Sequence, residues 1–513
     1  MAVLDFPGEV LPLDKDQQAK LRKFLHPAQI LLASLNDICP RGPPRKPSDA
    51  PPNPNQSLEE KFHTFVNKLA QICDFEPKGD TITAMAIIMH DGKVTYLLAS
   101  NRRGQGALNN ARKGLGQVLG ILKANLEAPA SLKESDEVVG RKLMERILWW
   151  NKVRVRSYLT ALVGELKKCM ERCDVSTPEG QAAMAGLDGM RKTLPDLGLG
   201  GQKTEIYIEA TIQCIKAIHA NRRSPLQRYI DARAAEDHTM VKGGSWSNLQ
   251  HAAGRLLSYE YAVQTLIEAH HTWANTDLFR DYEIESIRSS KPYENVKDLL
   301  LPTPETAEAI INRAPGYGRE RLEQLKQDAV DLNTKYQLNN RLKERWHLKA
   351  INPIVHAEIL LHSYLDCTPG GIQPPRFFSN IQYIGTSKPI CWMCEQHFSI
   401  ISTPVKFRSG HPNTYLNWRL PDLYVDVRPI GTRKDREQMA REGWCRDLGE
   451  MKRRVYAAVV RLLQEKVSEW KKFDSNTYTD RIRNGKTGDE KRAFESGTRS
   501  ADPRMDDNLT LRW

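Results

Sequence analysis

Long apolar runs are missing from the sequence, and cysteines are few. None of the 513 residues belongs to an uninterrupted apolar stretch that approaches the ~18 residues of a membrane span. Residues 1–6 carry no basic region before an apolar core, so we expect no secretory signal. Nine cysteines are an odd number and few for this length, which argues for reduced thiols and against a disulfide-stapled secreted protein. We therefore expect an intracellular protein, cytoplasmic or nuclear, with no membrane partner.

No single sign of charge dominates the chain. Lys and Arg number 75 against 63 Asp and Glu, and the resulting net charge of +12 is spread thinly. This excess permits a polyanionic partner such as nucleic acid but does not require one. A composition that is 40% apolar and 27% charged is that of a soluble globular protein. At ~150 residues per domain, the length predicts about three units, or one core with large insertions.

The first part of the chain predicts a helical segment followed by a linker. Residues 1–39 include a helical pattern at residues 17–35. Residues 40–56 are rich in proline, which has no N–H to donate to a helix or a sheet. We interpret them as an extended linker, with a ligand for a proline-binding module as the alternative.

Residues 57–103 predict a helix and then a β-hairpin. Ser57 is a helix cap with Glu60 three residues later, and apolar residues follow at helical spacing. Two short apolar runs, 81–89 and 93–99, flank an Asp-Gly pair, which is a strong hairpin signal.

The remaining chain divides by its periodicity. Residues 104–346 have a helical period almost throughout, which predicts an all-α insertion. Signals for both helices and strands return in residues 347–473. Residues 474–513 are polar and charged with little to bury, so we expect a mobile tail.

Three residues in the 347–473 segment are candidate metal ligands: His356, Cys391 and Cys394. Two cysteines at i and i+3 near the start of a predicted helix lie on the same side, one turn apart. The helix N-terminus carries positive partial charge, which favours thiolate over thiol. Two thiolates and a neutral imidazole suit tetrahedral Zn²⁺ with its fourth position open to water. Three ligands plus water predict a catalytic zinc site, and a structural zinc or a metal-free arrangement is the alternative.

Glu358, two residues after His356, is the candidate catalytic residue. Zinc lowers the pKa of its bound water to about 7, which makes hydroxide available at neutral pH. A carboxylate beside that hydroxide can relay its proton to a ring nitrogen and then to departing ammonia. The reaction is then hydrolytic loss of an exocyclic amine from cytosine or adenine.

The order His-x-Glu and then Cys-x-x-Cys resembles the zinc-dependent cytidine deaminase-like superfamily. The sequence of residues 383–394 resembles that of one of its branches, the OTT-like deaminases of filamentous fungi. The resemblance implies an α/β fold with a cytidine deaminase-like α-β-α three-layer core around a mixed sheet. Because the only good hairpin pattern is at residues 81–99, we predict that the 104–346 insertion splits this core. Such an insertion is tolerable because the entropy cost of loop closure grows only logarithmically.

The resemblance also implies residues that contact the substrate. Asn101, after the second hairpin strand, occupies the place of an Asn that holds the sugar or base in superfamily members. Pro389 lies near the carbonyl that lines the base pocket, although Ile390 separates it from the first cysteine, unlike many deaminases. Trp418, in an aromatic loop at 411–418, is a candidate for stacking on a base, with ordinary packing as the alternative.

We therefore expect a zinc-dependent hydrolytic deaminase that acts on a cytosine- or adenine-type base in a nucleotide or nucleic acid. The alternative hypothesis is a catalytically inactive deaminase fold that serves as an interaction scaffold. His362 and His397 are alternative metal ligands. The Arg102-Arg103 pair is a candidate contact for a substrate phosphate, with simple solvation as the alternative. The sequence predicts neither the choice of base nor the oligomeric state.

Overall fold

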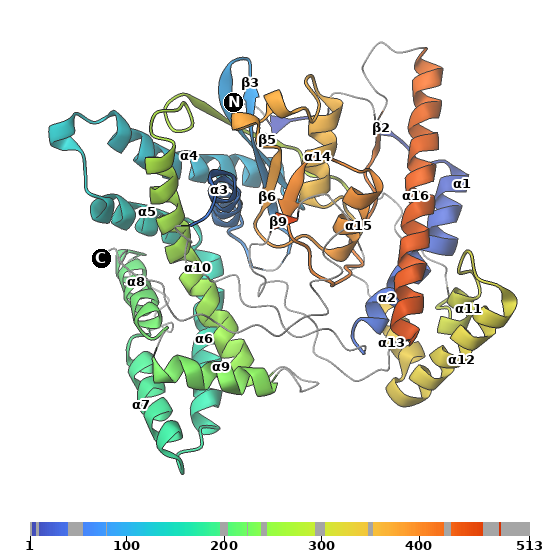
Figure 1. Ribbon diagram of the computed structural model, residues 1–513, viewed down its shortest axis with the longest axis horizontal. Helices are drawn as coiled ribbons and strands as arrows, with labels where there is room; N and C mark the ends of the chain where they lie inside the picture. The colour runs from blue at the N-terminus through green and yellow to red at the C-terminus, as the bar shows by residue number, and fades with distance from the viewer. Residues whose placement is uncertain are drawn as a thin grey trace.

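A mixed β-sheet runs through the centre of the molecule (Figure 1). The computed structural model describes residues 3–6, 10–38, 55–77, 79–194, 204–222, 224–237, 244–292, 303–346, 352–424, 432–464 and 482–483. In this part of the chain the sheet order is β1-β5-β4-β3-β6-β7-β9, and β2 pairs with β8 apart from it. The strands are β1 (Val3–Leu4), β2 (Val10–Leu11), β3 (Thr83–His90), β4 (Lys93–Ser100), β5 (Tyr282–Ile287), β6 (Tyr383–Thr386), β7 (Lys406–Arg408), β8 (Leu423–Tyr424) and β9 (Ile482–Arg483).

Helices cover both sides of the sheet, which confirms the α/β class. Figure 1 shows α4 to α10 to the left of the sheet, and α2, α11 to α13 and α16 to its right. None of these helices combines the length and the apolar content that a membrane span needs. The helices are α1 (Lys15–Lys20), α2 (His26–Leu35), α3 (Leu58–Cys73), α4 (Gln105–Glu127), α5 (Asp136–Trp150), α6 (Lys152–Glu171), α7 (Pro178–Lys192), α8 (Thr204–Ala220), α9 (Pro225–Asp237), α10 (Ser245–Thr272), α11 (Ala307–Ile311), α12 (Arg319–Tyr336), α13 (Leu338–Trp346), α14 (Ala357–Cys367), α15 (Trp392–Ile400) and α16 (Arg433–Gln464).

β3 and β4 form the hairpin predicted at residues 81–99. Their antiparallel register ends with His90 opposite Lys93, so Asp91 and Gly92 make the turn by themselves. Both turn residues have positive φ, 49° and 78°. A two-residue hairpin turn of this kind needs positive φ at both positions, and Asp-Gly adopts it at low cost. The local sequence therefore predicts this hairpin correctly.

Alternate residues of β3 face two separate apolar cores. Met85 and Ile87 pack in the core that includes α3, α4 and α10. Ala86 and Ile88 pack in the core that includes α2, α14 and α15. Because successive side chains of a strand point to opposite faces, the sheet is the middle one of three layers.

The insertion at residues 104–346 is not all-α, so that prediction is wrong. β5 lies within it and pairs in parallel with β4, with Val94 opposite Tyr282 and Leu98 opposite Ser286. Its sequence, Tyr-Glu-Ile-Glu-Ser-Ile, is short, and its period of two is easily missed among long helical stretches. The insertion thus returns to the sheet and adds a strand beside the hairpin.

The N-terminal segment at residues 1–39 is helical only in part. Its helices lie where the sequence predicts them, but β1 pairs with β5, and β2 pairs with β8. Strands of two residues carry no periodicity, which is why the sequence does not predict them. α2 packs against α13 and α16 in the core that contains α14 and α15. Residues 40–54 of the predicted linker lie outside the described residues, as does the predicted tail at 474–513 apart from β9, which pairs with β7.

β6 approaches α3 very closely at Gly385. A Cβ atom there would lie 2.7 Å from Val66 Cγ1 and 2.8 Å from the Val66 carbonyl carbon, so only glycine fits. One residue later, the Thr386 N–H donates to Asn67 Oδ1 of α3 at 3.0 Å. These contacts fix the strand that leads into the loop before Cys391.

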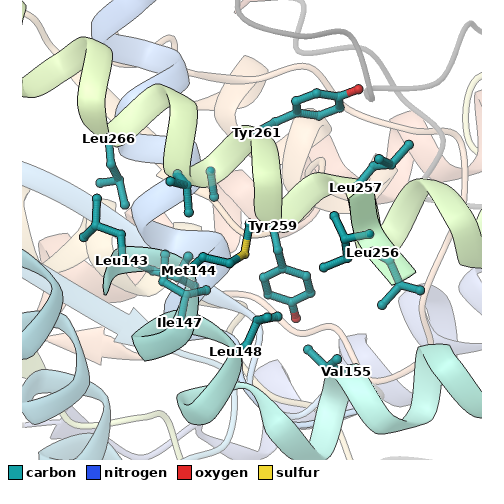
Figure 2. Close-up of a cluster of buried hydrophobic side chains, with 14 of the residues drawn as sticks. Leu143, Met144, Ile147, Leu148, Val155, Leu256, Leu257, Tyr259, Tyr261 and Leu266 are labelled. Atoms are coloured by element: carbon teal, nitrogen blue, oxygen red, sulfur yellow. The ribbon is translucent and has the colours of Figure 1, made fainter. Parts of the chain in front are cut away.

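The helical lobe, which we define as α5 to α10, contributes to a large apolar core (Figure 2). Figure 2 shows Leu143, Met144 and Ile147 of α5 beside Tyr259 and Leu266 of α10, and all five side chains are buried. The same cluster of buried residues continues into the sheet face that α3 covers. The lobe is therefore packed onto the sheet rather than tethered to it.

A buried ion pair joins the helical lobe to the end of α3. Arg154 Nη1 of α6 lies 2.5 Å from Asp74 Oδ1, and the two side chains are 6% and 2% exposed. The Thr81 hydroxyl donates to the same carboxylate at 2.7 Å, and Arg154 Nε donates to the Tyr158 hydroxyl at 2.7 Å. Each charge is thus compensated and hydrogen-bonded where water does not reach.

Candidate metal centre

The structure brings His356, Cys391 and Cys394 together at the start of two helices. His356 is the N-cap of α14, Cys391 is the N-cap of α15, and Cys394 lies in the first turn of α15. His356 Nδ1 is 3.6 Å from Cys391 Sγ and 3.3 Å from Cys394 Sγ, and the two sulfurs are 3.4 Å apart. All three side chains are buried.

These distances fit the ligand set of a tetrahedral zinc ion. With Zn–S bonds of about 2.3 Å and Zn–N bonds of about 2.0 Å, neighbouring ligand atoms lie about 3.5–3.8 Å apart. The three observed separations are within a few tenths of an ångström of that range. Among the described residues, these three form the one group of His, Cys, Asp or Glu side chains close enough to hold a metal ion. The group can therefore supply three ligands.

The protonation of the two thiols depends on burial and on their mutual contact. Burial raises the pKa of Cys391, but the Cys394 sulfhydryl and the His356 imidazole lower it by more, to about 6. Burial also raises the pKa of Cys394, and the neighbouring Cys391 sulfur raises it further. A divalent cation among these atoms would stabilise both sulfurs as thiolates, because a coordinating thiol loses its proton.

Glu358 lies beside the three ligands without being one of them. Its Oε1 is 4.0 Å from His356 Nδ1, and its side chain is 4% exposed. Its charge also helps to raise the pKa of the Cys394 thiol, after burial and the Cys391 sulfur. Since Glu358 is outside the close group of ligand atoms, the fourth position of a bound metal is left to a small molecule.

Asn101 positions the helix that begins after His356. Its Oδ1 accepts a hydrogen bond from the Ala357 N–H at 2.9 Å, and its Nδ2 donates to the Gly79 carbonyl at 3.2 Å. This contact joins the end of β4 to the first turn of α14, although 256 residues separate the partners. The predicted substrate contact of Asn101 is left with the second amide hydrogen and the second lone pair of Oδ1.

Trp418 and Pro389 are buried in the structure. The backbone of Trp418 forms an isolated parallel β-bridge with Ile354. Trp418 is 0% exposed and lies in the core that contains α14. Its ring therefore has no free face, and the prediction that it stacks on a base is wrong. Pro389 is also buried, and Ile390 separates it from Cys391.

Tyr415 is the aromatic residue that the sequence reasoning missed. Its ring centroid lies 6.4 Å from the His356 imidazole and 5.7 Å from the His411 imidazole, and the residue is half-buried. The loop is held by Gln29 Nε2, which donates to the Tyr415 carbonyl at 2.8 Å. The sequence does indicate an aromatic loop at residues 411–418, to which Tyr415 belongs. The spacing of its residues does not show which ring lies near His356.

The alternative ligands lie outside the metal group. Burial lowers the pKa of His362 to about 4 and that of His397 to about 3. His362 Nε2 is 2.7 Å from the Thr403 hydroxyl oxygen, a contact that occupies this nitrogen. Arg102 lies 3.5 Å from Asp80 and also bonds the Asn352 carbonyl, so its guanidinium is already engaged near the site.

Comparison with known proteins identifies one match. Residues 355–422 match the family described as OTT_1508-like deaminase. This stretch is similar to a deaminase. It contains all four residues of the centre, His356, Glu358, Cys391 and Cys394, and it supports an enzyme that acts on a carbon–nitrogen bond. The hairpin, the helical lobe and α16 lie outside the match, and no curated protein and no solved structure matches the chain.

Proposed function

We propose that this protein is a zinc-dependent hydrolytic deaminase of a cytosine- or adenine-type base in a nucleotide or nucleic acid. The observation that carries the proposal is the group of His356, Cys391 and Cys394 with the carboxylate of Glu358 beside it. The match of the same segment to a deaminase family supports it. A sheet between two layers of helices, with the candidate metal ligands at the start of α14 and α15, is the arrangement expected of a cytidine deaminase-like core.

Each residue of the centre has a distinct role in this proposal. Bound zinc would supply a Lewis acid that activates water for attack on the ring carbon bearing the amine. His356, Cys391 and Cys394 hold the ion, and Asn101 fixes the turn that presents His356. Glu358 accepts a proton from the attacking water and returns protons to the ring nitrogen and the departing amine. The products are the keto base and ammonia, which balance the base and water consumed.

Tyr415 is proposed to contact the face of the base, in place of Trp418. Replacing it with Leu removes the ring and should raise KM for the reactive substrate about tenfold, because base–aromatic stacking contributes about 1–3 kcal/mol. Tyr415→Phe keeps the ring and should leave KM within about twofold of wild type. Steady-state kinetics on the two variants tests this, and equal KM values for both would contradict a stacking role.

The proposed function is tested by metal analysis combined with ammonia release. The purified full chain should contain one zinc per molecule and release ammonia from at least one member of a panel. The panel consists of free bases, nucleosides, nucleotides and single-stranded DNA and RNA. Binding that weakens steeply with salt would assign a nucleic-acid substrate, because it reports phosphate contacts. Zinc without release from any panel member would favour the catalytically inactive scaffold instead.

A further inference from the structure

A cavity of about 130 Å³ lies within the helical lobe, between α5, α8 and α10. Met144 of α5 and two residues of α8, Ile212 and Ile215, line it, and all three side chains are buried. Met144 also belongs to the apolar cluster in Figure 2, so one wall of the cavity is the core of the lobe itself. An apolar cavity of about 150 Å³ admits benzene, and this one is slightly smaller but opens to solvent beside the exposed Glu137, so a single ring can enter it.

One wall of the cavity carries a buried carboxylate. Glu260 of α10 is 5% exposed, and its Oε2 lies 2.8 Å from His219 Nδ1. Among the described residues no donor contacts its Oε1, and because this atom is not one of the buried side-chain atoms without a partner, it is open to solvent on the cavity side. A carboxylate removed from water is costly unless a positive charge or several donors compensate it. The His219 imidazole pairs with one carboxylate oxygen, and the other oxygen is left to accept from a molecule in the cavity.

The basic residues that line the cavity both lie near another acid, Glu209. Arg141 donates to Glu145 at 2.6 Å and also bonds Glu209. The pKa of Glu209 is lowered mainly by its hydrogen bond with Arg141. The positive charge of Lys216 lowers it further. Glu137, at the rim, adds a second acid. The cavity therefore combines an apolar interior with a carboxylate oxygen that is open to a hydrogen-bond donor.

We propose that this cavity is a binding site for a small organic cation with an apolar body, such as an aryl or cycloalkyl amine. The apolar part fills the space beside Met144, Ile212 and Ile215, and the ammonium group donates to Glu260 Oε1. The ligand thereby completes the hydrogen bonding of the Glu260 carboxylate. This site belongs to the helical lobe and does not depend on the deaminase proposal.

The Met144 methyl group provides a direct probe of occupancy in the full chain. Methionine methyl groups are labelled with ¹³C, and the Met144 resonance is assigned by its loss in Met144→Leu. Benzylamine should shift this resonance, because an aromatic ring in the cavity adds a ring-current field. Benzyl alcohol and phenylacetate have the same ring without the cation, and they should bind at least tenfold more weakly. An unshifted Met144 signal at saturating benzylamine, or equal binding of all three compounds, would overturn the proposal.

A charge substitution tests the role of Glu260. Glu260→Gln keeps the shape of the side chain but removes its charge, and it should weaken benzylamine binding at least tenfold. Glu268→Gln on the same helix is the matched control, because Glu268 pairs with Lys61 and does not line the cavity. Its benzylamine affinity should equal that of wild type. Unchanged affinity in Glu260→Gln, or an equal loss in the control, rejects the site, and the ligand comparison on wild type decides if the variant does not fold.

Discussion

Glu358→Gln should keep one zinc ion per chain and lose ammonia release by a factor of about 10²–10⁴, the usual contribution of a positioned general acid–base. The amide has nearly the shape of the carboxylate but cannot accept and return a proton. Because Glu358 is not one of the three grouped ligands, its replacement should leave the metal in place. Metal analysis and ammonia release on the same preparation measure both results.

Two further variants make the Glu358 result specific. Cys394→Ala removes a ligand, so it should lose zinc and activity together. Glu323→Gln, at an exposed residue of α12, should retain both. If Glu358→Gln released ammonia at the wild-type rate, a proton-transfer role for this carboxylate would be excluded. If it lost zinc as well as activity, Glu358 would be a metal ligand instead.

Asp74→Asn should lower the free energy of unfolding by about 3–5 kcal/mol, because it leaves Arg154 charged, buried and without its partner. The Asp74–Arg154 ion pair connects the end of α3 to α6 of the helical lobe. Urea denaturation followed by tryptophan fluorescence measures the change. Glu268→Gln removes a half-exposed ion pair between α10 and α3, and it should cost less than about 1 kcal/mol. Comparable losses in the two variants would contradict the importance of burial.

The effect of Asp74→Asn should also depend on pH. Burial raises the pKa of Asp74, but the Arg154 charge and the Thr81 hydroxyl lower it by more, so its net direction is below the ordinary 3.8. A carboxyl whose pKa is lowered on folding stabilises the fold above its unfolded pKa and loses this contribution as pH falls through its folded pKa. The stability difference between wild type and Asp74→Asn should therefore be full at neutral pH and shrink below about pH 3.8. A difference that stayed constant as the pH fell well below 3.8 would show that folding does not lower the pKa of Asp74.

Local sequence signals predicted the parts of the centre that lie within a single element. His356 and Glu358 share the start of one helix, and Cys391 and Cys394 share the start of another. Their spacing was enough to propose one metal ion. The positions of Asn101 and Tyr415 were different in kind, because each depends on contacts between distant parts of the chain. The Asn101 oxygen reaches a helix 256 residues later, and no periodicity encodes that contact.

By itself, the sequence determined the hairpin at residues 81–99, the helices of the lobe and the choice of the three candidate metal ligands. These features depend on backbone preferences and on the repeat of apolar residues along one element. The tertiary structure decided that β5 joins the sheet and that Trp418 is buried while Tyr415 lies near His356. It also decided that an acid of α10 faces a cavity in the lobe. Pairing and burial between distant segments depend on the packing of the whole chain, which local patterns do not specify.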